Sequence, residues 1–216
     1  MEISFLYLLI FSIFFISLIW ILAEKIQNYS IVDIGWAGGF FINVWICYFF
    51  SEGWIWRRVL ISILVTCWSL RLAFHLAKRI FKLHPVEEGR YQTLRKKWKP
   101  KLKIYSFVFF QLQGLLLAIL SIPFIIISQN SNIGFSILEF GGFFLFGIAL
   151  LGESIADAQL QSFKKLKKNG ESVCQKGFWN YSRHPNYFFE WLIWVSLFFI
   201  SLPASWGWTT CFAPLL

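Results

Sequence analysis

The sequence predicts an all-α protein, a polytopic transmembrane helical bundle of six to seven spans, and three observations support this. Hydrophobic residues make up 57% of the 216 residues and charged residues only 14%, whereas a soluble domain carries about 25% charge. The mean hydropathy is +0.61, and apolar runs are long enough to cross a bilayer core of about 30 Å. The positive residues are bunched between those runs. Lipid must therefore face much of the chain.

Runs of apolar residues define the predicted spans, because a transmembrane helix needs about 20 of them. The predicted spans are 3–22, 31–50, 55–77, 104–128, 134–157 and 186–202, and a seventh span begins near 206. The first run lacks the basic start and cleavage site of a secretory signal, so we expect a retained helix. No Gly/Ser linker or internal repeat separates the spans, which predicts one transmembrane domain over 1–216. The chain stops inside an apolar run at Leu216, and we expect its C-terminus to be truncated.

Two basic segments orient the predicted bundle. Residues 78–103 contain ten Lys and Arg residues, and residues 158–185 contain six. Two spans separate the segments, so both lie on one side, which the positive-inside rule makes cytoplasmic. The chain is then a multi-pass protein of the cell membrane, and its N-terminus lies on the outer side of that membrane. Arg57 and Arg58 begin the third span on the outer side, a conflict that the two larger segments outweigh.

Charge and cysteine patterns exclude two classes of partner. The net charge of +9 comes from the bunched segments, which indicates topology, so we expect no nucleic-acid partner. The four cysteines, Cys47, Cys67, Cys174 and Cys211, lack metal-ligand spacing. We expect no metal site and interpret the cysteines as reduced and mostly buried.

Polar residues inside the spans form a second pattern, because ionisable groups in a bilayer are costly and usually mark function or a partner. With the orientation above, all except Glu139 fall in the cytoplasmic halves of five spans. The set comprises Asp33, Arg71, His75, Gln111, Gln113, Glu153, Asp157, Asn186 and Glu190. Three pairs are four residues apart and share a helix face: Arg71 with His75, Glu153 with Asp157, and Asn186 with Glu190. Turned inward, these faces would form a polar pocket that opens to the cytoplasm. Snorkelling of single side chains, or pairing of Arg71 with Asp33 or Asp157, is the simpler alternative.

The segment 177–191, GFWNYSRHPNYFFEW, carries the most specific motif. Pro185 suits the first position of a helix, where its missing N–H costs nothing. Arg183 and His184 precede that helix start, where free N–H groups favour an anion, and an arginine can clamp a phosphate with two bonds. The motif predicts a site for a phosphate-bearing ligand. A helix start with an interfacial arginine and aromatic belt is the alternative.

These residues carry a family resemblance. The segments 181–191 and 153–159 resemble the bacterial DUF1295 membrane proteins, which are similar to the C-terminal domain of steroid 5-alpha-reductases. The wider superfamily includes sterol C14 reductases and isoprenylcysteine carboxyl methyltransferases. Further matches are Asp33-Ile-Gly-Trp, Ser69-Leu-Arg-Leu with His75, and Glu88-Gly-Arg-Tyr91. The resemblance runs from about residue 31 to the C-terminus. It implies a steroid-reductase-like fold with the cofactor held by about 104–216.

The resemblance also implies site residues. Asp157, Asn186 and Glu190 match positions that line the NADPH pocket of the steroid reductases, and Glu153 is similar in position to another cofactor-facing residue. We add Arg183, His184, Arg71 and Lys164 as candidate cofactor contacts. The proton donor of the steroid enzymes lies in a region without a match here. The candidate acids are Tyr187, Tyr91 and His75. Family members also continue with a basic, Tyr-containing C-terminal segment that this chain lacks.

Together these patterns predict a membrane-embedded, NADPH-dependent oxidoreductase. Hydride from the nicotinamide would reduce a C=C bond of a hydrophobic small molecule, lipid- or steroid-like, that enters from the bilayer. One alternative is an S-adenosylmethionine-dependent methyltransferase of the isoprenylcysteine carboxyl methyltransferase type. A second alternative is a non-enzymatic transporter or scaffold, which the nearly apolar outer halves of the spans disfavour.

Overall fold

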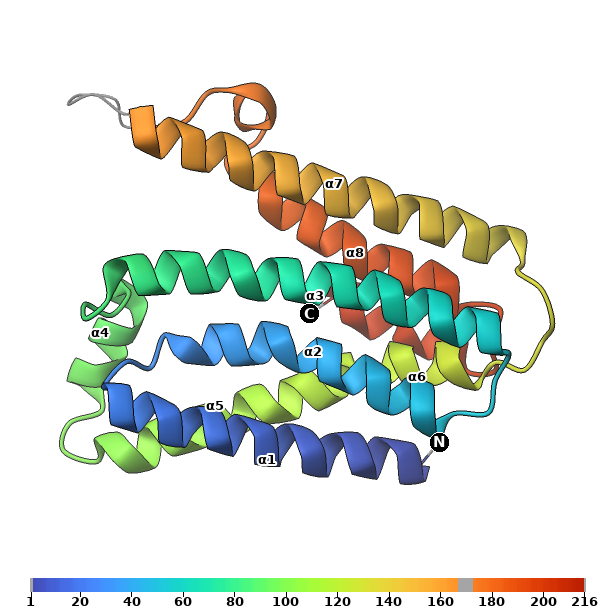
Figure 1. The fold of residues 1–216 in the computed structure, drawn as a ribbon, viewed down its shortest axis with the longest axis horizontal. Helices are drawn as coiled ribbons and strands as arrows, with labels where there is room; N and C mark the ends of the chain where they lie inside the picture. Colours follow the sequence, from blue (N-terminus) through green and yellow to red (C-terminus); the bar gives the residue numbers. More distant parts are fainter. Residues whose placement is uncertain (1, 167–172, 216) are drawn as a thin grey trace. The chain divides into compact units, whose positions relative to one another are not determined.

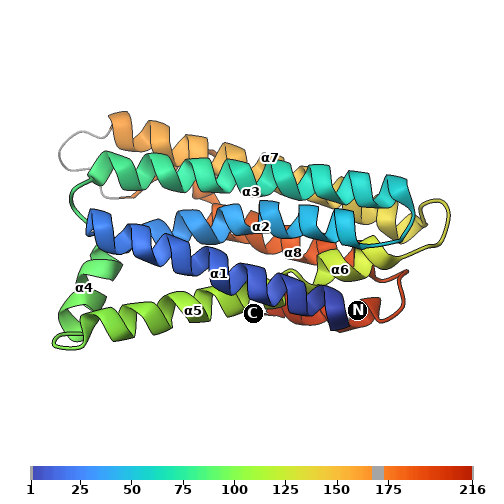
Figure 2. The ribbon, with the colours of Figure 1, turned by 60° about the horizontal axis from the view of Figure 1, so that its bottom comes forward.

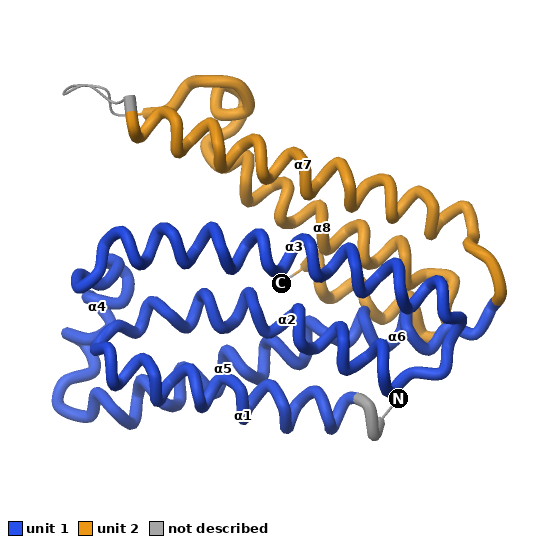
Figure 3. Tube along the Cα trace, in the orientation of Figure 1, with its two compact units in different colours: residues 1–132 blue, residues 133–216 orange. Residues whose placement is uncertain are grey.

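The computed structural model describes residues 2–166 and 173–215, and over this part of the chain it is all helical without a strand. The predicted fold class is therefore confirmed. Lys167 and Lys168 of the second basic segment, and Leu216, lie outside the described residues. The helices group into two compact units, Met1–Asn132 and Ile133–Leu216 (Figure 3).

Unit 1 is built from α1 to α6. Their bounds are α1 Glu2–Ile26, α2 Ile31–Phe50, α3 Ile55–Leu83, α4 Gly89–Lys97, α5 Leu102–Leu120 and α6 Ile122–Gln129. Helix α2 packs along α3, and α1 packs along α5 (Figure 1). The short α4 runs across one end of the unit in both ribbon views (Figures 1 and 2).

Unit 2 is built around one helix pair. Its elements are α7 Ile137–Leu166, the 3-10 helix η1 Gly177–Asn180, α8 Pro185–Ser201 and the 3-10 helix η2 Gly207–Leu215. Helices α7 and α8 lie side by side (Figures 1 and 2), and η2 packs against α8. Helix α8 begins at Pro185, as the sequence predicts.

Five apolar stretches among the described helices are long enough to cross a membrane. They are Phe5–Ile26, Ile31–Phe50, Ile55–Leu83, Leu102–Gln129 and Ile137–Lys165. Helix α8 has 17 residues, about 26 Å at 1.5 Å per residue, which is at the lower end of the spanning length. The expected start of a seventh span is instead η2, in which the Thr210 hydroxyl donates to the carbonyl of Gly207 at 2.8 Å. The chain is a membrane-embedded helical protein.

Helix α2 is held by polar side chains from its neighbours in unit 1. The Ser69 hydroxyl of α3 accepts from the backbone N–H of Phe41 at 3.0 Å and donates to the carbonyl of Ala37 at 2.7 Å. A regular helix would join those two backbone groups to each other. Further along α2, the Asn43 amide donates to the hydroxyls of Ser12 at 3.1 Å and Ser121 at 2.9 Å. Such bonds fix helix register where apolar contact alone is unspecific.

The two arginines that conflict with the positive-inside rule donate hydrogen bonds to backbone carbonyls at or just after the ends of helices. Arg57 is 1% exposed, and its guanidinium donates to the carbonyls of Asn130 at 2.8 Å and Asn132 at 2.9 Å. Arg58 donates to the carbonyl of Tyr48 in the last turn of α2 and to that of Ser51 just after the helix. The last carbonyls of a helix have no partner within the helix. Both arginines therefore have a structural role that does not depend on the orientation of the chain.

Glu139, the isolated acidic residue of the predicted outer half, belongs to a capping box at the start of α7. The Ser136 N–H donates to Glu139 Oε2 at 2.8 Å, and the Glu139 N–H donates to Ser136 Oγ at 3.2 Å. This reciprocal pair satisfies two backbone donors that a helix start leaves open. The spacing Ser-x-x-Glu that is typical of this box is visible in the sequence.

Glu139→Ala is expected to lower the free energy of unfolding by about 1 kcal/mol, because the box loses one of its two bonds. Glu139→Gln is the matched control, since glutamine also serves in capping boxes. Denaturant titration of the purified protein in detergent, followed by circular dichroism, measures both. An alanine variant as stable as wild type would show that the box contributes nothing.

Candidate functional site

The close approach of α7 and α8 positions the candidate site in unit 2. A Cβ added to Gly152 would lie 2.3 Å from the ring of Phe189, and one added to Gly142 would lie 2.6 Å from Ile200. Ala149 and Ala156 are fully buried on the same face of α7. A stripe of small residues lets two helix backbones come close in a membrane. It brings the C-terminal part of α7 against the first turns of α8.

Asp157 and Asn186 meet at this junction. The Asn186 amide nitrogen donates to Asp157 Oδ1 at 3.3 Å, although the two residues are 29 positions apart. Asp157 is 6% exposed, and Glu153, one turn earlier on α7, is 3% exposed. The amide oxygen of Asn186 is buried and accepts no hydrogen bond from the described residues. A buried acceptor of this kind costs about 1–3 kcal/mol unless a donor reaches it.

The segment before α8 is fastened to α7 beside Asp157. The Trp179 indole donates to the carbonyl of Ala156 at 2.8 Å, and the Phe178 N–H donates to Gln159 Oε1 at 3.0 Å. Gly177 has a φ of +57°, and a Cβ there would lie 2.2 Å from the Gln159 amide. Trp179 and Gln159 thus set where the chain enters the site. Sequence reasoning missed both roles, because only the folded chain shows which backbone groups they reach.

The groups at the start of α8 are more exposed. Arg183 and His184 are exposed just before Pro185, and the His184 ring stacks on Tyr187 with centroids 5.2 Å apart. Tyr187 is 68% exposed, whereas Glu190, one turn after Asn186, is half-buried. Lys164 is exposed near the end of α7. The Asp157 carboxylate and the Asn186 amide are therefore bordered by exposed basic and aromatic side chains.

In unit 1, Tyr91 belongs to a polar cluster that binds α4 to α2. Its hydroxyl donates to Asp33 Oδ1 at 2.6 Å, and Arg90 bonds to both Asp33 oxygens and to the hydroxyl. Tyr91 is 1% exposed, and burial, together with the negative charge of Asp33, raises the pKa of its hydroxyl. The hydroxyl stays protonated and is already bonded. This geometry favours an anchoring role for Tyr91 over the donation of a proton to substrate.

Two further ion pairs complete this cluster, which we call the α4 clamp. Glu87 bonds to Arg95 at 2.8 Å and accepts from the backbone N–H of Tyr29 at 2.6 Å. Glu88 bonds to Arg79 at 2.6 Å. The clamp joins α4 to the α1–α2 turn and to the end of α3. It also brings together Asp33-Ile-Gly-Trp and Glu88-Gly-Arg-Tyr91, two segments on which the family resemblance rests.

A comparison with family models decides the identity of the chain. The model described as "Protein of unknown function (DUF1295)" matches residues 19–216. The chain belongs to the DUF1295 family. The resemblance to that family is therefore confirmed, and the match includes both the α4 clamp and the Asp157–Asn186 pair. Comparisons with curated proteins and with solved structures find no match.

The candidate residues of this DUF1295 protein divide between its two units. Unit 2 holds Glu153, Asp157, Arg183, His184, Asn186, Tyr187, Glu190 and Lys164. Unit 1 holds Arg71 and His75, both half-buried on α3, and Tyr91. Asp33, an alternative partner for Arg71, bonds to Arg90 and Tyr91. The single pocket lined by five helices stays a prediction.

Proposed function

We propose that this DUF1295 protein is a membrane-embedded reductase that transfers hydride from NADPH to a C=C bond of a lipid- or steroid-like substrate. The observation that carries the proposal is the junction of Asp157 and Asn186, where a buried amide oxygen accepts no hydrogen bond from the part of the chain that the structure describes. The resemblance to steroid reductases implies the same residue types in a nicotinamide cofactor pocket. The family match itself assigns no activity.

The donors and acceptors at the junction fit a dinucleotide. The Asn186 oxygen can accept from a carboxamide N–H, and the Asp157 carboxylate can accept from a ribose hydroxyl. The exposed Arg183 beside the start of α8 suits a phosphate, which helix N-termini also favour. When bound, the nicotinamide supplies the hydride, and the protein binds it, orients it and excludes water.

Tyr187 is the acid that the geometry supports best among the three candidates. Its side chain is exposed and lies one residue after Asn186, whereas the hydroxyl of Tyr91 is held by Asp33. Stacking on His184 keeps the Tyr187 ring at the start of α8. In our proposal Tyr187 protonates the carbon next to the one that receives hydride.

We further propose that the protein lies in the cell membrane with both basic segments in the cytoplasm, the compartment that contains NADPH. The N-terminus then lies outside. The bonds of Arg57 and Arg58 to backbone carbonyls remove the conflict with this orientation, because they account for the positive charge at the opposite end of α3.

Ligand-induced thermal stabilisation of the full-length protein in detergent tests the function. We expect NADPH to raise the apparent melting temperature, since a ligand at 100 times its Kd stabilises the native state by about 2.7 kcal/mol. S-adenosylmethionine at the same concentration should have no effect. Stabilisation by S-adenosylmethionine alone would favour the methyltransferase and overturn the reductase.

A further inference from the structure

The arginines and the lysines of segment 78–103 make different contacts in unit 1. All three arginines bond to carboxylates of the same unit, so their charges are neutralised where they lie. The pairs are Arg79–Glu88 at 2.6 Å, Arg90–Asp33 at 2.8 Å and Arg95–Glu87 at 2.8 Å. Arginine suits this task, because its planar guanidinium bonds a carboxylate with two N–H groups. The arginines therefore hold α4 in place.

The lysines that follow are not neutralised. Five of them lie within eight residues and all are exposed: Lys96, Lys97, Lys99, Lys101 and Lys103. We call this set the lysine patch. None of the five makes an ion pair with another described residue, and the acidic residues of the segment are already bonded to arginines. The patch is thus a concentrated and uncompensated positive surface.

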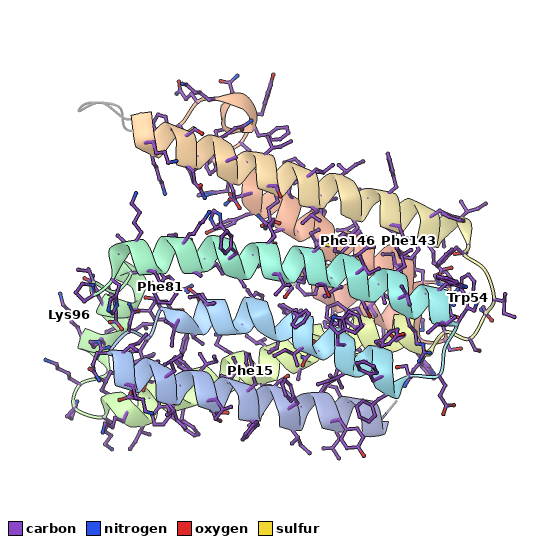
Figure 4. All side chains as sticks on the ribbon, in the orientation of Figure 1. Phe15, Trp54, Phe81, Lys96, Phe143 and Phe146 are labelled. Atoms are coloured by element: carbon purple, nitrogen blue, oxygen red, sulfur yellow. The ribbon has the colours of Figure 1, made fainter. Side chains whose placement is uncertain are left out.

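The patch lies at the border of an apolar surface. The membrane-spanning stretch Leu102–Gln129 begins within it, and the next side chains, Ile104 and Tyr105, are 61% and 45% exposed. Figure 4 labels Lys96 at the end of unit 1 that α4 occupies. Positive residues in the first turn of α5 oppose its helix dipole, so the stability of α5 does not explain them.

We propose that the lysine patch binds the phosphate groups of acidic phospholipids at the membrane surface. The apolar side chains of α5 place the patch at headgroup level, and anionic lipids are attracted to clusters of basic residues beside a span. Lysine offers a mobile point charge on a flexible stem, which suits headgroups that exchange. The α4 clamp fixes the segment while the lysines stay available to lipid. This site is independent of the proposed cofactor site.

Native mass spectrometry of the full chain, released from detergent micelles that contain equal amounts of phosphatidylglycerol and phosphatidylcholine, tests the proposal. Wild type is expected to retain phosphatidylglycerol in preference. The variant with all five patch lysines changed to glutamine should bind phosphatidylglycerol at least roughly tenfold more weakly, since each basic residue near an anionic surface contributes roughly fivefold. Circular dichroism should show unchanged helix content, because these side chains make no ion pair with residues 2–166 or 173–215.

The matched control removes the same net charge from exposed lysines outside the patch. It changes Lys25, Lys78, Lys82, Lys165 and Lys176 to glutamine. The control should lose clearly less phosphatidylglycerol binding than the patch variant, because its lysines are spread over α1, α3, α7 and the residue before η1 and do not form one cluster. An equal loss in the control, or equal retention of the two lipids by wild type, would overturn the proposal. Displacement of phosphatidylglycerol by millimolar inorganic phosphate would also overturn it, because the site would then bind free phosphate.

Discussion

Asp157→Ala is expected to reduce strongly the thermal stabilisation of the protein by NADPH while leaving it folded. Asp157 is 6% exposed and accepts a hydrogen bond from Asn186, which places its carboxylate at the proposed cofactor site. A hydrogen bond to a charged group contributes about 1.5–3 kcal/mol. Its loss should weaken NADPH binding by roughly 10- to 150-fold. Titration of the melting temperature with NADPH measures the change.

The capping residue of the same helix provides the control for this experiment. Glu139 is also a buried carboxylate on α7, but it bonds to Ser136 at the other end of the helix. Glu139→Ala should lower stability in the absence of ligand and leave the NADPH-induced shift unchanged. Asp157→Ala should instead reduce the NADPH-induced shift and leave the protein folded in the absence of ligand. A normal shift in the Asp157 variant would show that Asp157 is structural and would remove the main support for the reductase.

Replacing Asn186 removes the buried amide oxygen that accepts no hydrogen bond from the described residues, and so tests the second residue of the Asp157–Asn186 pair. Asn186→Ala is expected to weaken NADPH binding as Asp157→Ala does. The double variant should lose less affinity than the sum of the two single losses, because the Asn186 amide donates to Asp157 and each side chain positions the other. Additive losses in affinity would indicate that the bond between Asp157 and Asn186 does not couple their two contacts with the cofactor.

The bundle follows from local patterns, whereas its polar contacts do not. Apolar length predicts α2 at 31–50, and Pro185 predicts where α8 begins. The bonds from Ser69 to α2 and from Arg57 to Asn130 join residues 28 to 73 positions apart. A hydroxyl or guanidinium on a predicted helix can reach many partners. Only the packing of the helices selects among them.

The candidate site was predictable to a similar extent. Four-residue spacing places Asp157 and Asn186 on the right faces of α7 and α8. Their contact depends on the small residues Gly142 and Gly152, which let the two helices approach. Because glycine has no side chain, an analysis of polar side chains in the sequence does not single out either residue. The same reasoning gave Tyr91 as a candidate acid, because its bond to Asp33 depends on how α4 packs and cannot be seen in the sequence.

Tyr91→Phe is expected to destabilise the protein at neutral pH and to make its stability less sensitive to alkali. The change removes one bond to the Asp33 carboxylate, and a bond to a charged group contributes about 1.5–3 kcal/mol. In the folded protein, burial and the charge of Asp33 raise the pKa of the Tyr91 hydroxyl, whereas in the unfolded chain it ionises near pH 10. The contribution of the protonated Tyr91 hydroxyl to the free energy of unfolding is therefore complete below about pH 10 and is lost as pH rises towards the folded pKa. Above pH 10 the loss is about 1.4 kcal/mol per pH unit.

The difference in unfolding free energy between wild type and Tyr91→Phe should consequently narrow from pH 8 to pH 11. Burial also raises the pKa of Tyr29, but both proteins contain this residue, so its effect cancels in the difference. Tyr105→Phe is the control, since that side chain is exposed and makes no hydrogen bond within the described residues. It should match wild type at every pH. A constant difference across this range would mean that the hydroxyl of Tyr91 ionises as readily in the folded protein as in the unfolded chain, and the α4 clamp would then not depend on a buried, protonated tyrosine.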